Sequence, residues 1–226
     1  KARVLTESPP QFSLLETMLW TPEGGYFLRE KHTARLLDSA NYFDFPILCR
    51  GGTTPPLLPK EIIETYLDEI SSQFTSPQRV RLRLDTNGNL SHEAKSFQQT
   101  DNNLPLRICL AKKPINSGNV FLFHKTTHRE AYDTARKDFA GCDDVLLYNE
   151  KDELTEFTIG NIVVEMDGKL YTPPISCGLL PVTFRAHLLE SGEVAERAIQ
   201  VDELKNCTKI FLVNSVRKMQ LVELVV

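Results

Sequence analysis

The stretch NVFLFHK, residues 119–125, brings a lysine to the end of an apolar run, shortly before HREAYDTARKDF, residues 128–139. The first stretch predicts a strand over residues 119–124, and the second has the spacing of a helix. Lys125 is therefore expected at a rigid strand-to-helix junction. Burial can keep a lysine amine neutral, and a neutral amine can form an imine with a carbonyl compound. A lone lysine at a strand end is usually a surface group, so this interpretation depends on the rest of the chain.

A carboxylate and an anion-binding turn are both predicted downstream of Lys125. Glu156, in TEFTIGN, falls in an extended segment before an apolar run, although a half-exposed sheet glutamate paired with a lysine would have the same pattern. In GLLPVTFR, Pro181 suits a first helical turn, so the amides of Val182 and Thr183 and the Thr183 hydroxyl can point at a phosphate. A lysine, a carboxylate and a phosphate turn are the groups that pyridoxal 5'-phosphate requires for attachment, for its pyridine nitrogen and for its phosphate.

Upstream arginines can supply positive charge to such a site. Arg35, in HTARL, is a candidate for a phosphate contact, although by itself it has the pattern of a solvated helix arginine. Residues 79–84, RVRLRL, alternate arginine with apolar side chains, which predicts a half-buried antiparallel strand with its arginines on one face. Arg81 and Arg83 are therefore candidates for binding substrate carboxylates. An equally good interpretation leaves them on a solvent-facing sheet surface.

Composition and charge narrow the class of protein. The 226 residues include 26 basic and 30 acidic side chains, a net charge of −4 with no basic half, which argues against binding to nucleic acid. No apolar run approaches the roughly 18 residues of a membrane span. The first residues, KARVLTESPP, have no apolar signal-peptide core. We therefore expect a soluble, cytoplasmic protein with a small-molecule substrate and no membrane partner.

Cysteine and histidine spacing does not indicate a metal or redox site. The five cysteines are far apart and form no CxxC pair, so we expect them to be reduced and mostly packed. His124 and His128 have the i, i+4 spacing of a helical metal pair, yet no third ligand is evident. The sequence therefore predicts no metal.

The order of elements predicts a two-domain α/β protein. Residues 112–119, KKPINSGN, concentrate turn formers, and we place an interdomain linker there between a smaller domain, residues 1–111, and a larger cofactor-binding domain, residues 120–226. After an extended lead-in at residues 6–10, the first domain should contain strands at residues 12–20, 79–84, 89–97 and 104–111 and helices at residues 31–45 and from Pro59. The second should contain strands at residues 120–124, 144–148, 161–165 and 210–213 and helices at residues 128–139 and 182–190.

The chain resembles the class IV aminotransferase family, also called the fold-type IV pyridoxal enzymes. The resemblance extends from about Ser13 to Val213 and beyond, and so covers nearly the whole chain. Its motifs are LLETMLW, HTARLLDSANYF, HKTTHREAYDTAR, DDVLLYNEKDELTEFTIGNIVVEMDG, SCGLLPVTFRAHLLE and IFLVNSVRK.

This resemblance implies a role for six residues at the cofactor. They are the Schiff-base lysine Lys125, the pyridine-nitrogen partner Glu156, the phosphate arginine Arg35, the phosphate turn Val182 and Thr183, and Asn214, whose segment approaches phosphate and substrate. One departure is visible, because relatives often carry glycine where this chain has Val182. A β-branched residue would be strained there if the position required a positive φ, and cofactor affinity would then fall.

The resemblance also implies a D-amino acid aminotransferase-like homodimer with pyridoxal 5'-phosphate between the two α/β domains of each subunit. LLETMLW and IFLVNSVRK are most similar to the lyases of the family, which implies elimination from 4-amino-4-deoxychorismate to give 4-aminobenzoate and pyruvate in folate biosynthesis. An aminotransferase for branched-chain or D-amino acids would use the same cofactor residues, and a third interpretation is a cofactor-free domain kept for dimerisation. Because the chain begins with lysine, we also expect a fragment that is fused to, or acts with, aminodeoxychorismate synthase.

Overall fold

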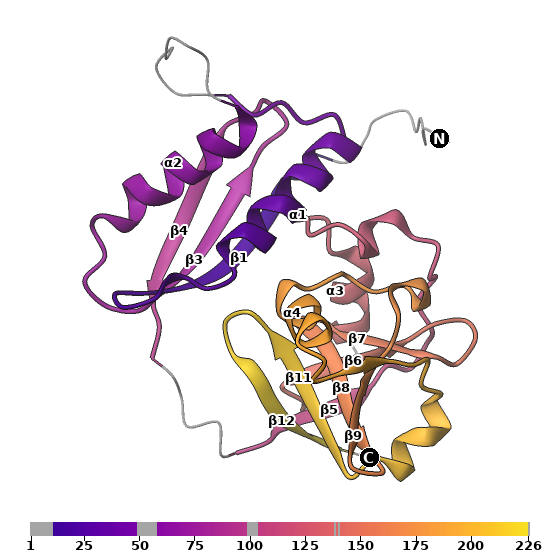
Figure 1. The fold of residues 1–226 in the computed structure, drawn as a ribbon. Helices are drawn as coiled ribbons and strands as arrows, with labels where there is room; N and C mark the ends of the chain where they lie inside the picture. Colours follow the sequence, from indigo (N-terminus) through magenta and orange to yellow (C-terminus); the bar gives the residue numbers. More distant parts are fainter. Residues whose placement is uncertain (1–10, 49–57, 99–103, 138, 140, 226) are drawn as a thin grey trace.

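The computed structural model of the chain describes residues 11–48, 58–98, 104–137, 139 and 141–225, which form two sheets with their own helices (Figure 1). The first sheet has the order β2-β1-β3-β4, and the second has the order β10-β9-β8-β11-β12-β5-β6-β7. The extended lead-in predicted at residues 6–10 lies outside the described residues. Among the described residues, no helix has both the length and the apolar composition that a membrane crossing requires.

The first sheet is covered on one face by two helices. In β3 apolar side chains alternate with arginines, and the apolar side chains on the helix-covered face of the sheet pack with the helices into one core that includes Leu14, Met18, Val80 and Leu82. The side chains between them, including the arginines of β3, face the other way. The elements are β1 (Leu14–Thr21), β2 (Gly25–Tyr26), α1 (Arg29–Tyr42), α2 (Pro59–Ser71), β3 (Gln78–Leu84) and β4 (Leu90–Ser96).

Local sequence signals explain two boundaries in this domain. Pro59 occupies the first turn of α2, and the Glu61 carboxylate accepts a hydrogen bond from the Leu58 amide at 2.8 Å, which caps the helix start. The predicted hairpin turn is confirmed, because Gly88 has a φ of 88° and the chain reverses there between β3 and β4.

The second sheet closes on itself. Because β8 pairs with β7 as well as with β9 and β11, six strands form a ring in the order β8-β11-β12-β5-β6-β7. Ile162 and Val164 point into the packed interior, whereas Val163 between them packs under α4. The elements are β5 (Leu106–Leu110), η1 (Val120–Leu122), α3 (Glu130–Lys137), β6 (Asp144–Tyr148), β7 (Leu154–Phe157), β8 (Gly160–Met166), β9 (Lys169–Thr172), η2 (Ile175–Cys177), α4 (Thr183–Glu190), β10 (Ala195–Glu196), η3 (Val201–Asn206), β11 (Lys209–Asn214) and β12 (Lys218–Leu224).

The strand β5 belongs to the second sheet, where it pairs in parallel with β6 and β12. The chain therefore changes sheets before Leu106, ahead of the linker predicted at residues 112–119. Both partners of β5 come later in the sequence, so its own alternation gives no sign of which sheet it joins.

The prediction of a strand at residues 119–124 is wrong. Val120–Leu122 form the short 3-10 helix η1, because the Asn119 side chain accepts a hydrogen bond from the Phe121 amide at 3.1 Å and turns the chain. Leu122 packs in the core of the second domain beside Val145, whereas Phe121 packs against the first domain, where its ring stacks on that of Phe43 with centroids 5.9 Å apart. The helix predicted at residues 128–139 is present, as α3, but begins two residues later.

Two cysteines are paired. Cys109 and Cys142 form a disulfide with Cα atoms 5.9 Å apart, so the expectation that all the cysteines are reduced is wrong for these two. They meet because β5 and β6 are adjacent parallel strands. Cys177 and Cys207 are free, and Cys49 lies outside the described residues.

Candidate active site

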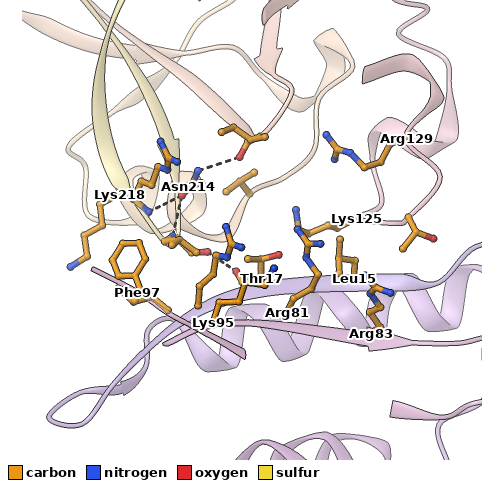
Figure 2. A pocket seen from close by; sticks show the side chains of 18 of the residues that line it. Leu15, Thr17, Arg81, Arg83, Lys95, Phe97, Lys125, Arg129, Asn214 and Lys218 are labelled. Carbon is orange, nitrogen blue, oxygen red and sulfur yellow. Dashed lines mark hydrogen bonds between the residues drawn. The ribbon is translucent and has the colours of Figure 1, made fainter. Parts of the chain in front are cut away.

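A cavity of about 800 Å³ lies between the first sheet and the second domain. The face of β1 and β3 that points away from the helices forms one wall, and the loop around Lys125, one side of α3 and the turn between β11 and β12 form the others. Figure 2 shows Lys125 facing this space from one domain and Arg81 facing it from the other. The predicted residues Arg35, Arg81, Arg83, Lys125, Val182 and Asn214 all line it, whereas Glu156 and Thr183 are buried behind the lining residues.

The backbone around Lys125 is docked on the first strand of the other domain. The Lys125 carbonyl accepts a hydrogen bond from the Leu15 amide at 2.9 Å, and the Thr127 amide donates to the Ser13 carbonyl at 2.9 Å. Thr126 forms an antiparallel bridge with Leu14. Lys125 therefore extends into the cavity from a segment held by both domains, rather than from a strand end as predicted.

Lys125 has the electrostatics of a nucleophile. Burial lowers the pKa of its amine to about 8, and the nearby Arg35 charge acts in the same direction, while Glu16 opposes both. At such a pKa a usable fraction of the amine is neutral near pH 7, unlike that of an ordinary lysine.

Glu156 is a buried carboxylate on β7 that receives three hydrogen bonds from neutral donors. The Tyr132 hydroxyl donates to Oε1 at 2.7 Å, and the backbone amide of Leu180 donates to the same oxygen at 3.1 Å. The side-chain Nδ2 of Asn161 donates to Oε2 at 3.0 Å. Burial raises the pKa of Glu156 to about 8, although the bonds from Tyr132 and Leu180 and the charge of Lys125 act against this rise. A positively charged group placed beside Glu156 would restore its ionised form.

Asn161 connects Glu156 to the predicted phosphate turn. Its Nδ2 also donates to the Leu180 carbonyl at 3.0 Å, and its Oδ1 accepts from the Val182 amide at 3.3 Å. One buried side chain therefore sets the position of the carboxylate and of the turn before α4. The Val182 amide is already engaged here, which leaves the amides of the first turn of α4 as the donors for an anion.

The strain considered for Val182 is absent. Val182 has φ −68° and ψ 137°, an extended conformation that a β-branched residue adopts readily, and it serves as the N-cap of α4. Valine at this position therefore has no backbone cost, and a glycine is not required there.

Arg35 is held by a buried network that links the two domains. It donates two hydrogen bonds to the Glu16 carboxylate, at 2.9 and 2.6 Å, and one to the Pro181 carbonyl at 3.0 Å. His32 Nδ1 lies 2.6 Å from Glu16, and His32 Nε2 lies 3.1 Å from the Thr183 hydroxyl. Arg35 and Thr183, the predicted phosphate ligands, are thus connected by a chain of hydrogen bonds that runs through the Glu16 carboxylate and the His32 imidazole.

Burial shifts the protonation of Glu16 and of His32 in this network differently. Burial would raise the pKa of Glu16, but Arg35 and His32 outweigh it and bring the pKa down to about 2. Burial lowers the pKa of His32, which favours the neutral ring. Glu16 is therefore ionised at neutral pH, and its carboxylate partly balances the Arg35 guanidinium before any anion binds.

Asn214 shapes the turn between β11 and β12. Its Oδ1 accepts from the amides of Val216 and Arg217, at 3.1 and 2.8 Å, and its Nδ2 donates to the Ile159 carbonyl at 3.2 Å. The adjacent Ser215 hydroxyl donates to the Thr17 carbonyl at 3.0 Å and ties this turn to the first sheet. Asn214 therefore lies at the cavity, where its side chain organises the turn.

The cavity is strongly cationic. Among the described residues that line it, a single side chain, Asp133, is acidic, and ten are basic. Arg81 forms an ion pair of 4.0 Å with Glu93, but no described carboxylate pairs with Arg83. The ten are Arg35, Arg79, Arg81, Arg83, Lys95, Lys125, Arg129, Arg136, Arg217 and Lys218.

The sequence did not single out four residues that complete the site: Glu16, His32, Tyr132 and Asn161. Glu16 and His32 are each 1% exposed, and their burial is visible only once β1 and α1 are packed together. One signal was available for Glu16, a lone acidic residue in the otherwise apolar LLETMLW. A charge at a core-facing strand position usually has a partner.

The residues present fit pyridoxal 5'-phosphate. A lysine with a lowered pKa lines the cavity, and a carboxylate without a hydrogen-bonded cation lies buried near it. An arginine and the N-terminus of the eight-residue helix α4 meet at the same wall, where they suit a phosphate. Among the described residues no group of three side chains could hold a metal ion instead.

Comparisons with known proteins agree with this geometry. Residues 13–225 match the family described as "Amino-transferase class IV". The chain is 34% identical to "Putative aminodeoxychorismate lyase" of Schizosaccharomyces pombe over 214 residues, 91% of this chain and 87% of that protein. It is also 34% identical to a solved "Putative amino-acid aminotransferase" from Mesorhizobium loti, with a TM-score of 0.83 over 95% of this chain and 100% of that one. A solved "Putative 4-amino-4-deoxychorismate lyase" from Legionella pneumophila shares the fold at 19% identity, with a TM-score of 0.79 over 94% of this chain and 82% of that one.

Proposed function

Because the chain belongs to the class IV aminotransferases, a family of pyridoxal-phosphate-dependent enzymes, we propose that it binds this cofactor and acts as a 4-amino-4-deoxychorismate lyase. The products would be 4-aminobenzoate and pyruvate, on the route to folate. The similarity to the Schizosaccharomyces pombe protein, over most of both chains, supports this choice. We also propose a cytoplasmic homodimer that acts with, or is fused to, aminodeoxychorismate synthase, as the family resemblance implies.

The charge of the cavity is the observation that carries this proposal. The lyase substrate has two carboxylates, whereas a branched-chain amino acid would direct an aliphatic side chain into the same space. Ten basic side chains and one acidic side chain among the described lining residues suit the dianion, because a cleft lined by one sign of charge concentrates ligands of the opposite sign. The cofactor phosphate would neutralise only part of this charge.

Arg81 and Arg83 are our candidates for binding the substrate carboxylates. They alternate on β3, so both point from the first sheet into the cavity that Lys125 enters from the other domain. Arg83 is exposed and has no described carboxylate as an ion-pair partner. Arg79 lines the same wall and was not singled out from the sequence.

The roles of the residues follow from their positions. When bound, the cofactor supplies an electron sink for the bond that is broken at the amine-bearing carbon. Lys125 would be the point of attachment, and its released amine would take the proton from that carbon of the substrate ring. The neighbouring C–O bond then breaks, enolpyruvate leaves and takes up a proton to become pyruvate, and the ring becomes aromatic.

Two further groups hold the cofactor in this proposal. Glu156 would keep the pyridine nitrogen protonated, which maximises electron withdrawal from the substrate. Arg35 and the first amides of α4 would bind the phosphate. The walls contributed by the two domains would restrict the access of water to the reacting carbon.

Replacing Arg35 by alanine should weaken cofactor binding more than it slows the loaded enzyme, because Arg35 would contact phosphate and not the reacting carbon. Hydrogen bonds to charged groups are worth roughly 1.5–3 kcal/mol, so we expect a rise of about ten- to a hundredfold in the cofactor dissociation constant. Equilibrium dialysis of the cofactor-free protein measures this constant.

The variant Arg35→Lys is the control, because it keeps a charge beside Glu16 but cannot form the forked pair. We expect it to lie between the wild type and Arg35→Ala. Equal affinity in all three proteins would contradict a phosphate contact.

The experiment that tests the lyase proposal uses the purified chain loaded with cofactor, aminodeoxychorismate and no keto acid. A lyase leaves its cofactor as the aldehyde, so 4-aminobenzoate and pyruvate should form over many turnovers in equal amounts. An aminotransferase would convert its cofactor to the amine form, stall after one turnover and resume when 2-oxoglutarate is added. The second pattern would overturn the lyase proposal while leaving the cofactor assignment intact.

A further inference from the structure

Tyr132 makes the shortest of the hydrogen bonds that reach Glu156. Its hydroxyl donates to Glu156 Oε1 at 2.7 Å, and the two side chains are 7% and 2% exposed. Such a bond, between a buried phenol and a buried carboxylate, is well shielded from water and therefore strong.

Tyr132 also ties the lysine segment to the strand that carries the glutamate. It lies on α3, seven residues after Lys125 along the chain. Arg129, between them, donates from Nη2 to the Thr158 carbonyl at 2.6 Å, two residues beyond Glu156. The segment that presents the lysine is thus joined at two points to the segment that presents the carboxylate.

Arg129 connects this pair to the cavity. Its guanidinium carbon lies 4.6 Å from the centre of the Tyr132 ring, and its side chain lines the cavity. A cation over the ring strengthens the phenol as a hydrogen-bond donor. Arg129 therefore supports the Tyr132 contact from the side that faces the site.

The groups that act on Glu156 come from several elements around it. They are the Lys125 and Arg129 charges, the Tyr132 hydroxyl, the Leu180 amide and the Asn161 amide. Each of these favours the ionised carboxylate, and burial opposes them all. Tyr132 makes the shortest of the three hydrogen bonds to this carboxylate, so removing its hydroxyl should disturb Glu156.

We propose that Tyr132 is a positioning residue, which holds Glu156 at a fixed place relative to Lys125 and favours the ionised form of its carboxylate when the pyridine nitrogen of the cofactor lies beside it. This inference rests on the proposed cofactor. It assigns Tyr132 no contact with substrate, so its effect should appear in kcat and in the pH profile, and not in KM.

The test compares Tyr132→Phe with the wild type in the full chain. We expect kcat to fall about tenfold with KM unchanged, and the acid limb of the kcat profile to move about one pH unit upward, because Glu156 would then ionise less readily. The cofactor dissociation constant of the cofactor-free protein should rise about threefold to tenfold, as measured by dialysis. Thermal unfolding of the cofactor-free variant checks that the fold is retained.

Tyr171→Phe is the matched control. Tyr171, on β9, also lies beneath an arginine, with the Arg197 guanidinium 5.6 Å from its ring centre, and its hydroxyl has no hydrogen-bond partner in the part of the chain that the structure describes. We expect this variant to behave as the wild type in kcat, pH profile and cofactor affinity.

Each other outcome is informative. A Tyr132→Phe protein with the wild-type pH profile and cofactor affinity would overturn the inference, as would a lower kcat without movement of the acid limb, which indicates packing alone. A wild-type chain that binds no cofactor would overturn the proposed function together with this inference. Cofactor binding to the wild type separates the two cases: if the wild type binds the cofactor, only the role of Tyr132 has failed, and if it does not, the proposed function has failed as well.

Discussion

Lys125→Ala should reduce the formation of 4-aminobenzoate by at least about a thousandfold, because both the attachment point and the proton-transferring amine would be lost. Borohydride reduction of the loaded wild type, followed by peptide mapping, should place the cofactor on Lys125 alone. The variant should show no such adduct and no visible absorbance from covalently attached cofactor. Lys113→Ala, which removes an exposed lysine outside this cavity, is the control and should retain wild-type activity.

The pKa of Lys125 makes a second measurement possible on the same residue. Cofactor attachment needs the neutral amine, so its rate should rise with pH and level off near the pKa of about 8. An ordinary lysine would continue to gain rate up to about pH 10.4. An adduct at another lysine, or a rate that still rises at pH 10, would contradict the assignment of Lys125.

Glu156→Gln should leave the cofactor covalently attached and slow turnover by about a hundred- to a thousandfold. A neutral amide cannot hold the pyridine nitrogen protonated, so the ring withdraws electrons less well. The glutamine side chain would also place its own N–H groups where three hydrogen-bond donors now point at a carboxylate. Some of these buried donors would then lack an acceptor. Steady-state kinetics and the absorbance spectrum of the bound cofactor measure the two effects separately.

Glu156→Asp separates charge from position. It keeps the carboxylate but shortens the side chain by one methylene, so we expect turnover between that of the wild type and that of Glu156→Gln. Wild-type turnover in the Gln variant would show that another group sets the protonation of the ring.

The sequence alone was sufficient for elements whose pattern is local. The strand predicted at residues 144–148 matches β6, and the helix predicted from Pro59 begins where α2 begins, because an apolar run and a proline at a helix start depend only on neighbours along the chain. The strand predicted at residues 79–84 falls within β3, and the alternation that predicted it placed its arginines on one face, which in the structure lines the cavity.

The sequence was less informative where the same local pattern is compatible with two different structures. The run NVFLFH is apolar enough for a strand, but Asn119 caps a 3-10 turn and Phe121 packs against Phe43 of the first domain. The disulfide partners Cys109 and Cys142 are 33 residues apart and meet only because β5 and β6 pair. Neither outcome is encoded in spacing alone.

The sequence by itself determined the family and the order of the strong elements and singled out Lys125 and Glu156 as candidates, because these depend on residue type and short-range periodicity. The tertiary structure decided the rest: which sheet β5 joins, how Glu16 and His32 connect Arg35 to Thr183, and how Tyr132 and Asn161 surround Glu156. It also decided the lowered pKa of Lys125 and the raised pKa of Glu156. Strand partners, burial and the charges that surround a group are set by segments far apart in the chain, and they exist only when the two domains are packed together.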